Sequence, residues 1–130
     1  MPRVSAAFFT LSFLYLLIGM IWGQYMGASE DHTLYPAHAH LNLVGGVLSA
    51  VYGTFYALTE KTTLQPRMAW INLVFSLTGV IVMIGSLAIF LSHGNDPKYV
   101  PGMVTGEILN VIGMLVFGVS VLRELVRKRA

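Results

Sequence analysis

Residues 68–95 read MAWINLVFSLTGVIVMIGSLAIFLSHGN, and this run contains no Asp, Glu, Lys or Arg. A helix of about 20 apolar residues is long enough to cross the roughly 30 Å hydrocarbon core of a bilayer. Three further runs are similar, although Glu107 interrupts the last of them: Val4 to Ser29, His32 to Thr59, and Tyr99 up to Arg123. The sequence therefore predicts an all-α integral membrane protein, with one four-helix domain over residues 1–130 and helices near 4–28, 36–59, 68–93 and 100–125.

The composition agrees with a lipid environment. Apolar residues make up 55% of the chain and charged residues only 11%, against about 25% charged residues in soluble domains. The first run is too long for a signal-peptide core and lacks a small-residue cleavage site before Glu30, so we expect a retained helix. The absence of Cys excludes thiolate metal sites, thiol catalysis and disulfides.

The charges predict an orientation. Seven of the eight Lys and Arg residues fall in the N-terminus, the middle loop near residues 60–67 or the C-terminal tail, and only Lys98 falls elsewhere. The positive-inside rule places both termini and the middle loop in the cytoplasm, with the other two loops outside. We therefore expect a multi-pass protein of the plasma (inner) membrane. Because the positive residues flank the spans, the net charge of +2 indicates no nucleic-acid role.

All four histidines fall toward the predicted outer face: His32, His38, His40 and His93. Ionisable groups near membrane depth are costly and are candidates for a functional site. Residues two apart on a helix are separated by about 200° around its axis, so His38 and His40 are expected on opposite flanks. In a regular helix they cannot share one metal, and each would serve a different site.

The two flanks also differ in character. A small and polar stripe continues below His38: Asn42, Gly45, Ser49, Tyr52 and Tyr56. An apolar stripe continues below His40: Leu43, Val44, Val47, Val51 and Phe55. The apolar stripe would suit a macrocycle, although ordinary helix packing produces the same pattern.

Residues 31–46 read DHTLYPAHAHLNLVGG, and this segment, continuing to Tyr56, resembles the tenth helix of the catalytic subunit of haem–copper oxidases, especially the C-family oxidases and nitric oxide reductases. The rest of the chain matches only as generic membrane helix. The resemblance implies that His38 and His40 are axial ligands of haem iron, with Asn42 and Gly45 beside the cofactor. The family's twelve helices form three arcs of four around a pseudo-threefold axis, and this chain resembles a single arc.

The chain departs from the family by lacking the histidines of the copper site, the cross-linked tyrosine motif and the other low-spin haem ligand. A complete oxidase site in one protomer is therefore not expected. Instead, we predict a homo-oligomer, with a homotrimer favoured, in which His40 of one copy faces His38 of the next and haem b lies at each interface. In the competing geometry, His93 pairs with His38 or His40 inside one bundle.

The leading function is a haem b membrane cytochrome that transfers electrons to or from an unknown redox partner. One alternative is an oxidoreductase acting on O₂ or NO, which needs an open coordination position, so the sequence leaves open whether the chain is an enzyme. Another is a non-enzymatic copper- or haem-handling protein or an oxidase accessory subunit.

Two minor features remain open. Glu107 shares a helix face with Met103, Asn110 and Met114. It is either a proton-relay group, a propionate neighbour or a hydrogen-bond partner in a haem channel, or a neutral carboxyl satisfied by Asn110 or a backbone carbonyl. The pairs Asp31 with His32 and Asp96 with His93 are either surface sites for a metal such as copper or solvated loop residues.

Overall fold

The computed structural model describes residues 1–59 and 66–127. Within these ranges the chain is all-helical, and four helical spans are each long and apolar enough to cross a membrane. The second span is a single continuous helix made of three elements, and a short 3-10 turn precedes the last helix. In chain order the elements are α1 (Arg3–Ser29), α2 (Tyr35–His40), the π-helix η1 (Leu41–Val47), α3 (Leu48–Leu58), α4 (Pro66–Ser92), the 3-10 turn η2 (Pro97–Tyr99) and α5 (Val100–Val126).

The prediction of an all-helical protein with four potential membrane spans is confirmed for these residues. The observed ends fall within two residues of the expected ones when α5 is counted from Val100. Pro36 lies in the first turn of α2, where its missing N–H breaks no hydrogen bond. The middle loop was predicted near residues 60–67; its residues 60–65 lie outside the described ranges, and Arg67 belongs to the first turn of α4.

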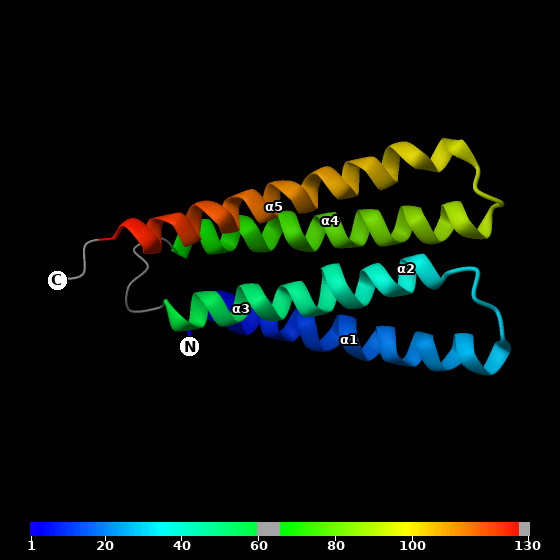
Figure 1. The fold of residues 1–130 in the computed structure, drawn as a ribbon, viewed down its shortest axis with the longest axis horizontal. Coiled ribbons are helices and arrows are strands. Elements are labelled where there is room, and N and C mark those ends of the chain that lie inside the picture. Colours follow the sequence, from blue (N-terminus) through cyan, green and yellow to red (C-terminus); the bar gives the residue numbers. More distant parts are fainter. Residues whose placement is uncertain (60–65, 128–130) are drawn as a thin grey trace.

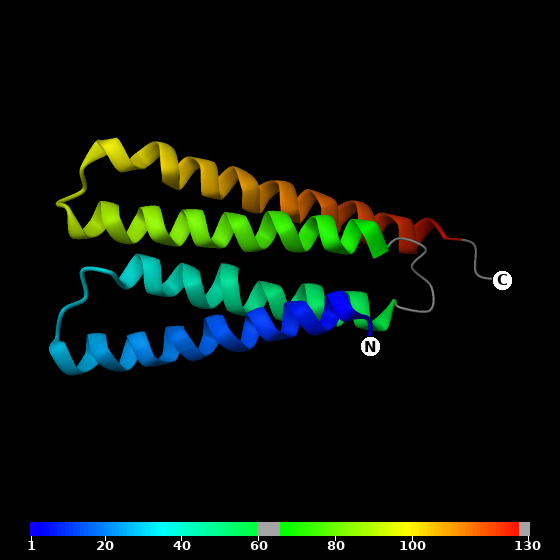
Figure 2. The same ribbon diagram turned by 180° about the vertical axis from the view of Figure 1, so that it is seen from behind.

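The two ends of the bundle differ. At one end, here called the histidine end, the turns over residues 30–34 and 93–96 connect the helices in pairs. Both of these turns use left-handed backbone just after a helix, at Glu30 (φ 55°) and at Gly94 and Asn95 (φ 65° and 61°). At the opposite end, here called the terminal end, the described chain begins and finishes, as Figures 1 and 2 show.

The core at the terminal end is aromatic. Phe8 of α1 is fully buried and packs edge-on against Tyr52 and stacked against Tyr56, with ring centroids 5.5 and 5.8 Å away. Phe117 brings α5 onto the same group, with its ring 4.8 Å from that of Tyr52. Such ring pairs add to the area burial that holds the helices together.

A buried hydrogen-bonded chain joins α3, α4 and α5 beside these rings. The Ser76 hydroxyl donates to the Asn72 carboxamide oxygen at 2.8 Å, and the Asn72 amide donates to the Tyr56 hydroxyl at 3.2 Å. The Tyr56 oxygen lies 3.4 Å from that of Ser120, whose own hydroxyl donates to a backbone carbonyl of its helix. Each of these four side chains has a hydrogen-bond partner. The hydrogen-bonded chain therefore links the helices without leaving any of its own polar groups unsatisfied.

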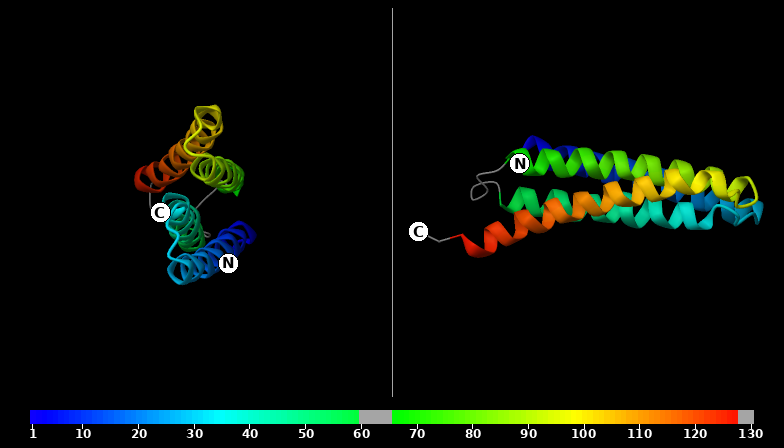
Figure 3. Two further views of the ribbon diagram at one scale, coloured as in Figure 1. Left: turned by 90° about the vertical axis from the view of Figure 1, so that its right-hand side faces the viewer. Right: turned by 90° about the horizontal axis from the view of Figure 1, so that it is seen from above.

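Glycines allow close approach at two of the helix contacts. On α5, a Cβ at Gly106 would collide with the Met83 backbone of α4, so these helices touch almost backbone to backbone. On α1, Gly19 and Gly23 lie against the second span. At the histidine end, α1 and α5 lie on opposite sides of the pair formed by the second span and α4, as Figures 1 and 3 show.

Candidate functional site

The second span changes from α-helix to π-helix at Leu41, directly after His40. Short π segments inside helices are rare and occur frequently at functional sites. Within this segment, Gly45 and Gly46 are buried, and the Tyr15 ring lies 3.1 Å from where a Cβ on Gly45 would stand. The sequence reading assumed a regular helix and did not include this change.

The two stripes below the histidines face different surroundings. In the stripe below His38, Asn42 is half-buried. The other four residues are buried: Gly45, Ser49, Tyr52 and Tyr56. Below His40, Leu43, Val47 and Val51 are exposed, and Val44 and Phe55 are half-buried. The structure therefore directs the His38 flank into the bundle and the His40 flank outward.

His38 is half-buried against α1. Its ring packs edge-on to Trp22 at 6.1 Å, and its Cε1 lies 3.0 Å from where a Cβ on Gly23 would stand. The Asn42 amide donates to His38 Nε2 at 3.4 Å, which is at the long limit for a hydrogen bond. If this weak bond is made, Nδ1 carries the proton, and Nδ1 is buried without a hydrogen-bond partner. The His38 imidazole is therefore poorly satisfied for a group at this depth.

An open groove lies in front of His38. Its volume is about 580 Å³, and it is lined by His38 and Asn42 together with a face of α1 formed by Met20, Gly23, Gln24, Gly27 and Ala28. This volume falls within the roughly 300–1,000 Å³ of ordinary ligand sites. Nothing lies within 4 Å of the Cβ position of Gly27, so the glycine side of the groove is open.

His40 is exposed and held in one orientation. Its Nδ1 lies 2.7 Å from the Pro36 carbonyl oxygen. A carbonyl only accepts hydrogen bonds, so Nδ1 donates, and in the neutral ring Nε2 carries a free lone pair. Metal-binding histidines are commonly oriented in this way, with the second ring nitrogen donating to a backbone carbonyl.

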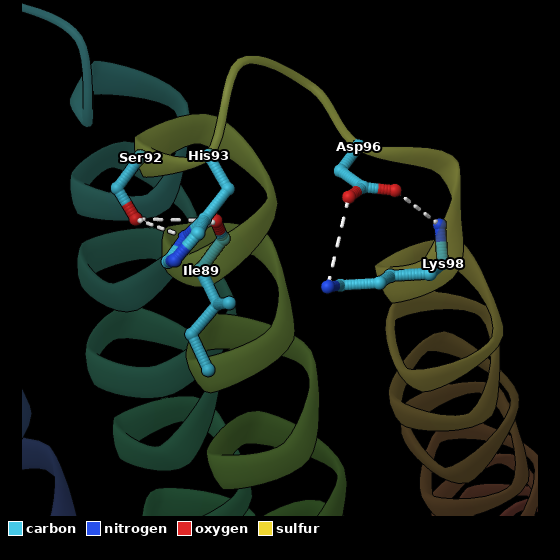
Figure 4. Close-up of polar contacts among 5 residues, drawn as sticks. All are labelled: Ile89, Ser92, His93, Asp96 and Lys98. Atoms are coloured by element: carbon cyan, nitrogen blue, oxygen red, sulfur yellow. Dashed lines mark hydrogen bonds and ion pairs between the residues drawn. The ribbon is translucent and has the colours of Figure 1, made fainter.

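His93 has the same local arrangement at the end of α4. Its Nδ1 lies 2.9 Å from the Ile89 carbonyl oxygen and 3.3 Å from the Ser92 hydroxyl. Figure 4 shows the His93 ring directed toward Ser92 and Ile89, whereas the Asp96 side chain points to Lys98. Of the two alternatives for His93 and Asp96, the arrangement favours solvated loop residues, because the two side chains are not directed at one site in this structure.

The other acidic candidate in a loop is Asp31. Its carboxylate accepts hydrogen bonds from the Thr33 hydroxyl at 2.6 Å and from the Thr33 backbone amide at 3.0 Å. These bonds to Thr33, together with the nearby His32, hold the pKa of Asp31 below its usual value. The carboxylate is thus engaged in capping its own turn.

Glu107 makes no hydrogen bond to Asn110 in this structure. The Asn110 amide donates to the Gly106 carbonyl oxygen at 3.0 Å and lies 3.8 Å from the Met83 sulfur, while Glu107 is exposed on α5. The predicted neutral carboxyl satisfied by Asn110 is not observed in this structure. Glu107 instead points away from the packed interior.

The sequence reading missed the part of α1 that surrounds His38. No pattern in the sequence marks Trp22 or Gln24 as functional, and Gly19, Gly23 and Gly27 by themselves indicate only a face of α1 that another helix can approach closely. Their four-residue spacing was the available signal, since it places them on one face of α1. Only the structure shows that His38 and Asn42 lie on that face.

Within the described residues, no group of three or more His, Asp or Glu side chains is arranged to hold a metal ion. The candidate ligands are instead two separately oriented imidazoles, His38 beside the groove and His40 on the outward flank. Comparisons with protein-family models, curated proteins and solved structures find no match to this chain.

Proposed function

We propose that this chain is a multi-pass protein of the plasma (inner) membrane, with both termini in the cytoplasm and the histidine end on the outer side. The four apolar spans support insertion. Arg3, Arg67, Arg123 and Arg127 lie at the terminal end, whereas Lys98 lies at the histidine end. This asymmetry is what the positive-inside rule requires of that orientation.

Within the membrane, we propose that the protein is a haem b cytochrome in which His38 and His40 are axial ligands. The observation that carries this proposal is the outward Nε2 of His40, fixed by the 2.7 Å contact between Nδ1 and the Pro36 carbonyl. Exposed Leu43 and Val47 continue below it as an apolar surface. His38 fits the same role because its ring lines an open groove and lacks good hydrogen-bond partners. Asn42 and Gly45 lie on the same side of the helix as His38.

In this proposal the two axial ligands come from two copies of the chain. His38 and His40 face different surroundings, so one iron cannot take both from the same copy. His40 of one copy would therefore pair with His38 of the next, in a closed homo-oligomer for which three copies are our preferred number. Haem supplies one-electron redox chemistry, and two axial imidazoles leave no coordination position for O₂ or NO. The protein thus acts in electron transfer, with its redox partner unidentified.

The experiment is an absorbance spectrum of the purified, detergent-solubilised protein in its oxidised and dithionite-reduced forms. We expect a low-spin b-type spectrum that does not respond to CO. Either His38→Ala or His40→Ala should produce a five-coordinate, CO-reactive form, whereas the matched control His93→Ala should leave the spectrum unchanged. A changed spectrum in His93→Ala would instead favour the geometry inside one bundle.

Two other outcomes would favour the alternative functions. Rapid CO binding to the reduced wild-type protein indicates an open position and supports an oxidoreductase acting on O₂ or NO. Stoichiometric copper without a haem spectrum, after expression with ample haem, supports metal handling or an accessory role. Either result would replace the electron-transfer proposal.

A further inference from the structure

Exposed threonine hydroxyl groups on the spans form hydrogen bonds within their own helices. Thr10, Thr54, Thr78 and Thr105 each donate to the backbone carbonyl four residues earlier, at 2.7 to 2.8 Å. Bonding within the helix is the ordinary way for a polar side chain to face lipid, because no water is available there. These four threonines therefore need no partner from another molecule.

Gln24 of α1 and Glu107 of α5 are different. Both side chains are exposed, and neither makes a hydrogen bond or ion pair within the described residues. Their helix neighbours are exposed apolar residues, with Met20 and Ile21 at 67% and 62% and Ile108 and Val111 at 53% and 58%. A carboxamide and a carboxyl on such surfaces are costly in lipid unless they find hydrogen-bond partners.

Counted along their own helices, the two side chains lie at similar distances from the histidine end. Gln24 comes five residues before the end of α1 at Ser29, and Glu107 comes seven residues after the start of α5 at Val100. At about 1.5 Å per residue, they lie about 8 and about 10 Å from the histidine end. Their heights in a membrane would therefore allow direct contact.

Contact within one copy is prevented by the fold. At the histidine end, the second span and α4 separate α1 from α5, as Figures 1 and 3 show. A contact between these two residues must therefore join the α1 side of one copy to the α5 side of another. Such a contact uses two different surfaces, and head-to-tail contacts of this kind form a ring when the rotation from one copy to the next divides a full turn evenly.

We propose that the Gln24 amide of one copy donates a hydrogen bond to the Glu107 carboxyl of the next, inside the outer half of the membrane. The occupant of each surface is thus a second copy of this chain. The chemistry is complementary, since Gln24 supplies amide donors and Glu107 supplies carboxyl acceptors. Gln24 also lines the groove in front of His38, so the contact lies beside the proposed haem site but does not depend on haem.

The chain contains no Cys, so introduced thiols report this contact without background. The test variant carries Gln24→Cys and Glu107→Cys together, and native membranes are treated with an oxidant and with a short bifunctional thiol reagent. The reagent is included because a disulfide requires Cα atoms about 4.4–6.8 Å apart, closer than two long side chains need to be. We expect a ladder of cross-linked species that ends at the size of the ring.

The matched control carries Thr10→Cys with Glu107→Cys. Thr10 is exposed on nearly the same face of α1 as Gln24 but lies about 21 Å farther from the histidine end. We expect no cross-linking in this control. Absence of cross-links in the test pair, or equal cross-linking in the control, overturns the proposal.

A second measurement uses uncrosslinked protein. Native mass spectrometry should show wild-type complexes that are multiples of the 14.3 kDa chain. Gln24→Leu and Glu107→Leu should shift these complexes at least tenfold toward the single chain, and Glu107→Gln, which keeps an acceptor, should retain them. A wild-type protein that is only monomeric contradicts the contact.

Repeating the cross-linking in a His40→Ala background separates this proposal from the haem proposal. Cross-links that persist in His40→Ala protein, whose haem site has lost a ligand, would show that the contact stands without that site. Cross-links in a wild-type protein that contains no haem would leave the contact standing and remove the cytochrome. Loss of cross-links in the His40→Ala background would show that the contact depends on the His40 site, which contradicts the independent contact proposed here.

Discussion

The side-chain oxygen of Asn42 occupies the space in which a Cβ on residue 19 would lie, so Gly19 and Asn42 fit together only because residue 19 has no side chain. Asn42 also carries the amide that contacts His38. The shape of α1 therefore positions a residue of the proposed site on another span.

Replacing this glycine should disturb both packing and the site. We expect Gly19→Ala to lower the free energy of unfolding by about 1–3 kcal/mol, the usual cost of overpacking a tight contact. The matched control is Gly27→Ala, because nothing lies within 4 Å of its Cβ position. Circular dichroism during denaturant titration in mixed micelles measures both variants. Equal stability of the two variants would contradict the close fit of Gly19 and Asn42.

The contact between α4 and α5 allows a similar comparison. Gly106→Ala should destabilise the protein by about 1–3 kcal/mol, because its Cβ would meet the backbone of Met83, which cannot rotate away. Gly118 lies on the same helix in open space, so Gly118→Ala should leave stability unchanged or slightly higher. The same titration tests this pair, and a stable Gly106→Ala protein would show that the two helices are farther apart than described.

The buried hydrogen-bonded chain makes a separate prediction. Asn72→Leu removes both the bond from Ser76 and the bond to Tyr56, and we expect a loss of about 1–3 kcal/mol in the free energy of unfolding. Thr78→Val is the control, since the Thr78 hydroxyl bonds only to its own helix and is exposed. A neutral Asn72→Leu variant would show that the network does not hold the helices together.

The lowered pKa of Asp31 predicts how the stability of its turn depends on pH. Its pKa is lowered from the 3.8 of a free Asp, chiefly by the hydrogen bond from the Thr33 side chain. A lowered folded-state pKa means that the turn is stabilised above pH 3.8 and loses that stabilisation as the pH falls through the lowered pKa. Thr33→Val should move the pKa of Asp31 upward toward 3.8, whereas Thr105→Val should not move it. Carboxyl chemical shifts in an NMR titration measure this difference, and an unchanged pKa in Thr33→Val would rule out the side-chain bond.

The sequence predicted the spans well because hydropathy and length alone decide which segments can cross a bilayer. It also placed Ser49 and Tyr52 on a different flank from Leu43 and Val47, since helical periodicity fixes which residues share a face. That the first flank is buried and the second exposed came from the structure. The π-helix after His40 was not predicted. It accompanies contacts of η1 with α1, such as Asn42 on Gly19 and Gly45 beside Tyr15, and no local pattern records contacts between distant segments.

For the same reason, the surroundings of the candidate ligands were only partly predictable. The two-residue spacing of His38 and His40 was enough to place them on different flanks. It could not show that Trp22 and Gly23 enclose one side of His38, or that Pro36 fixes His40 through its carbonyl oxygen. Glu107 was expected beside Asn110, but Asn110 bonds to its own helix and packs toward α4.

The central claim is that His40 of one copy and His38 of the next hold one haem, and mixed oligomers test it most directly. Equal amounts of His38→Ala and His40→Ala chains are co-expressed, and the low-spin haem signal is measured by electron paramagnetic resonance of the oxidised protein. Neither variant alone can form a site with two imidazoles, whereas random mixing restores both imidazoles at about one interface in four. We predict that the low-spin signal reappears in the mixture at roughly that fraction of the wild-type value. A mixture whose spectrum is the average of the two separate variants, or a wild-type protein without haem, would contradict the account.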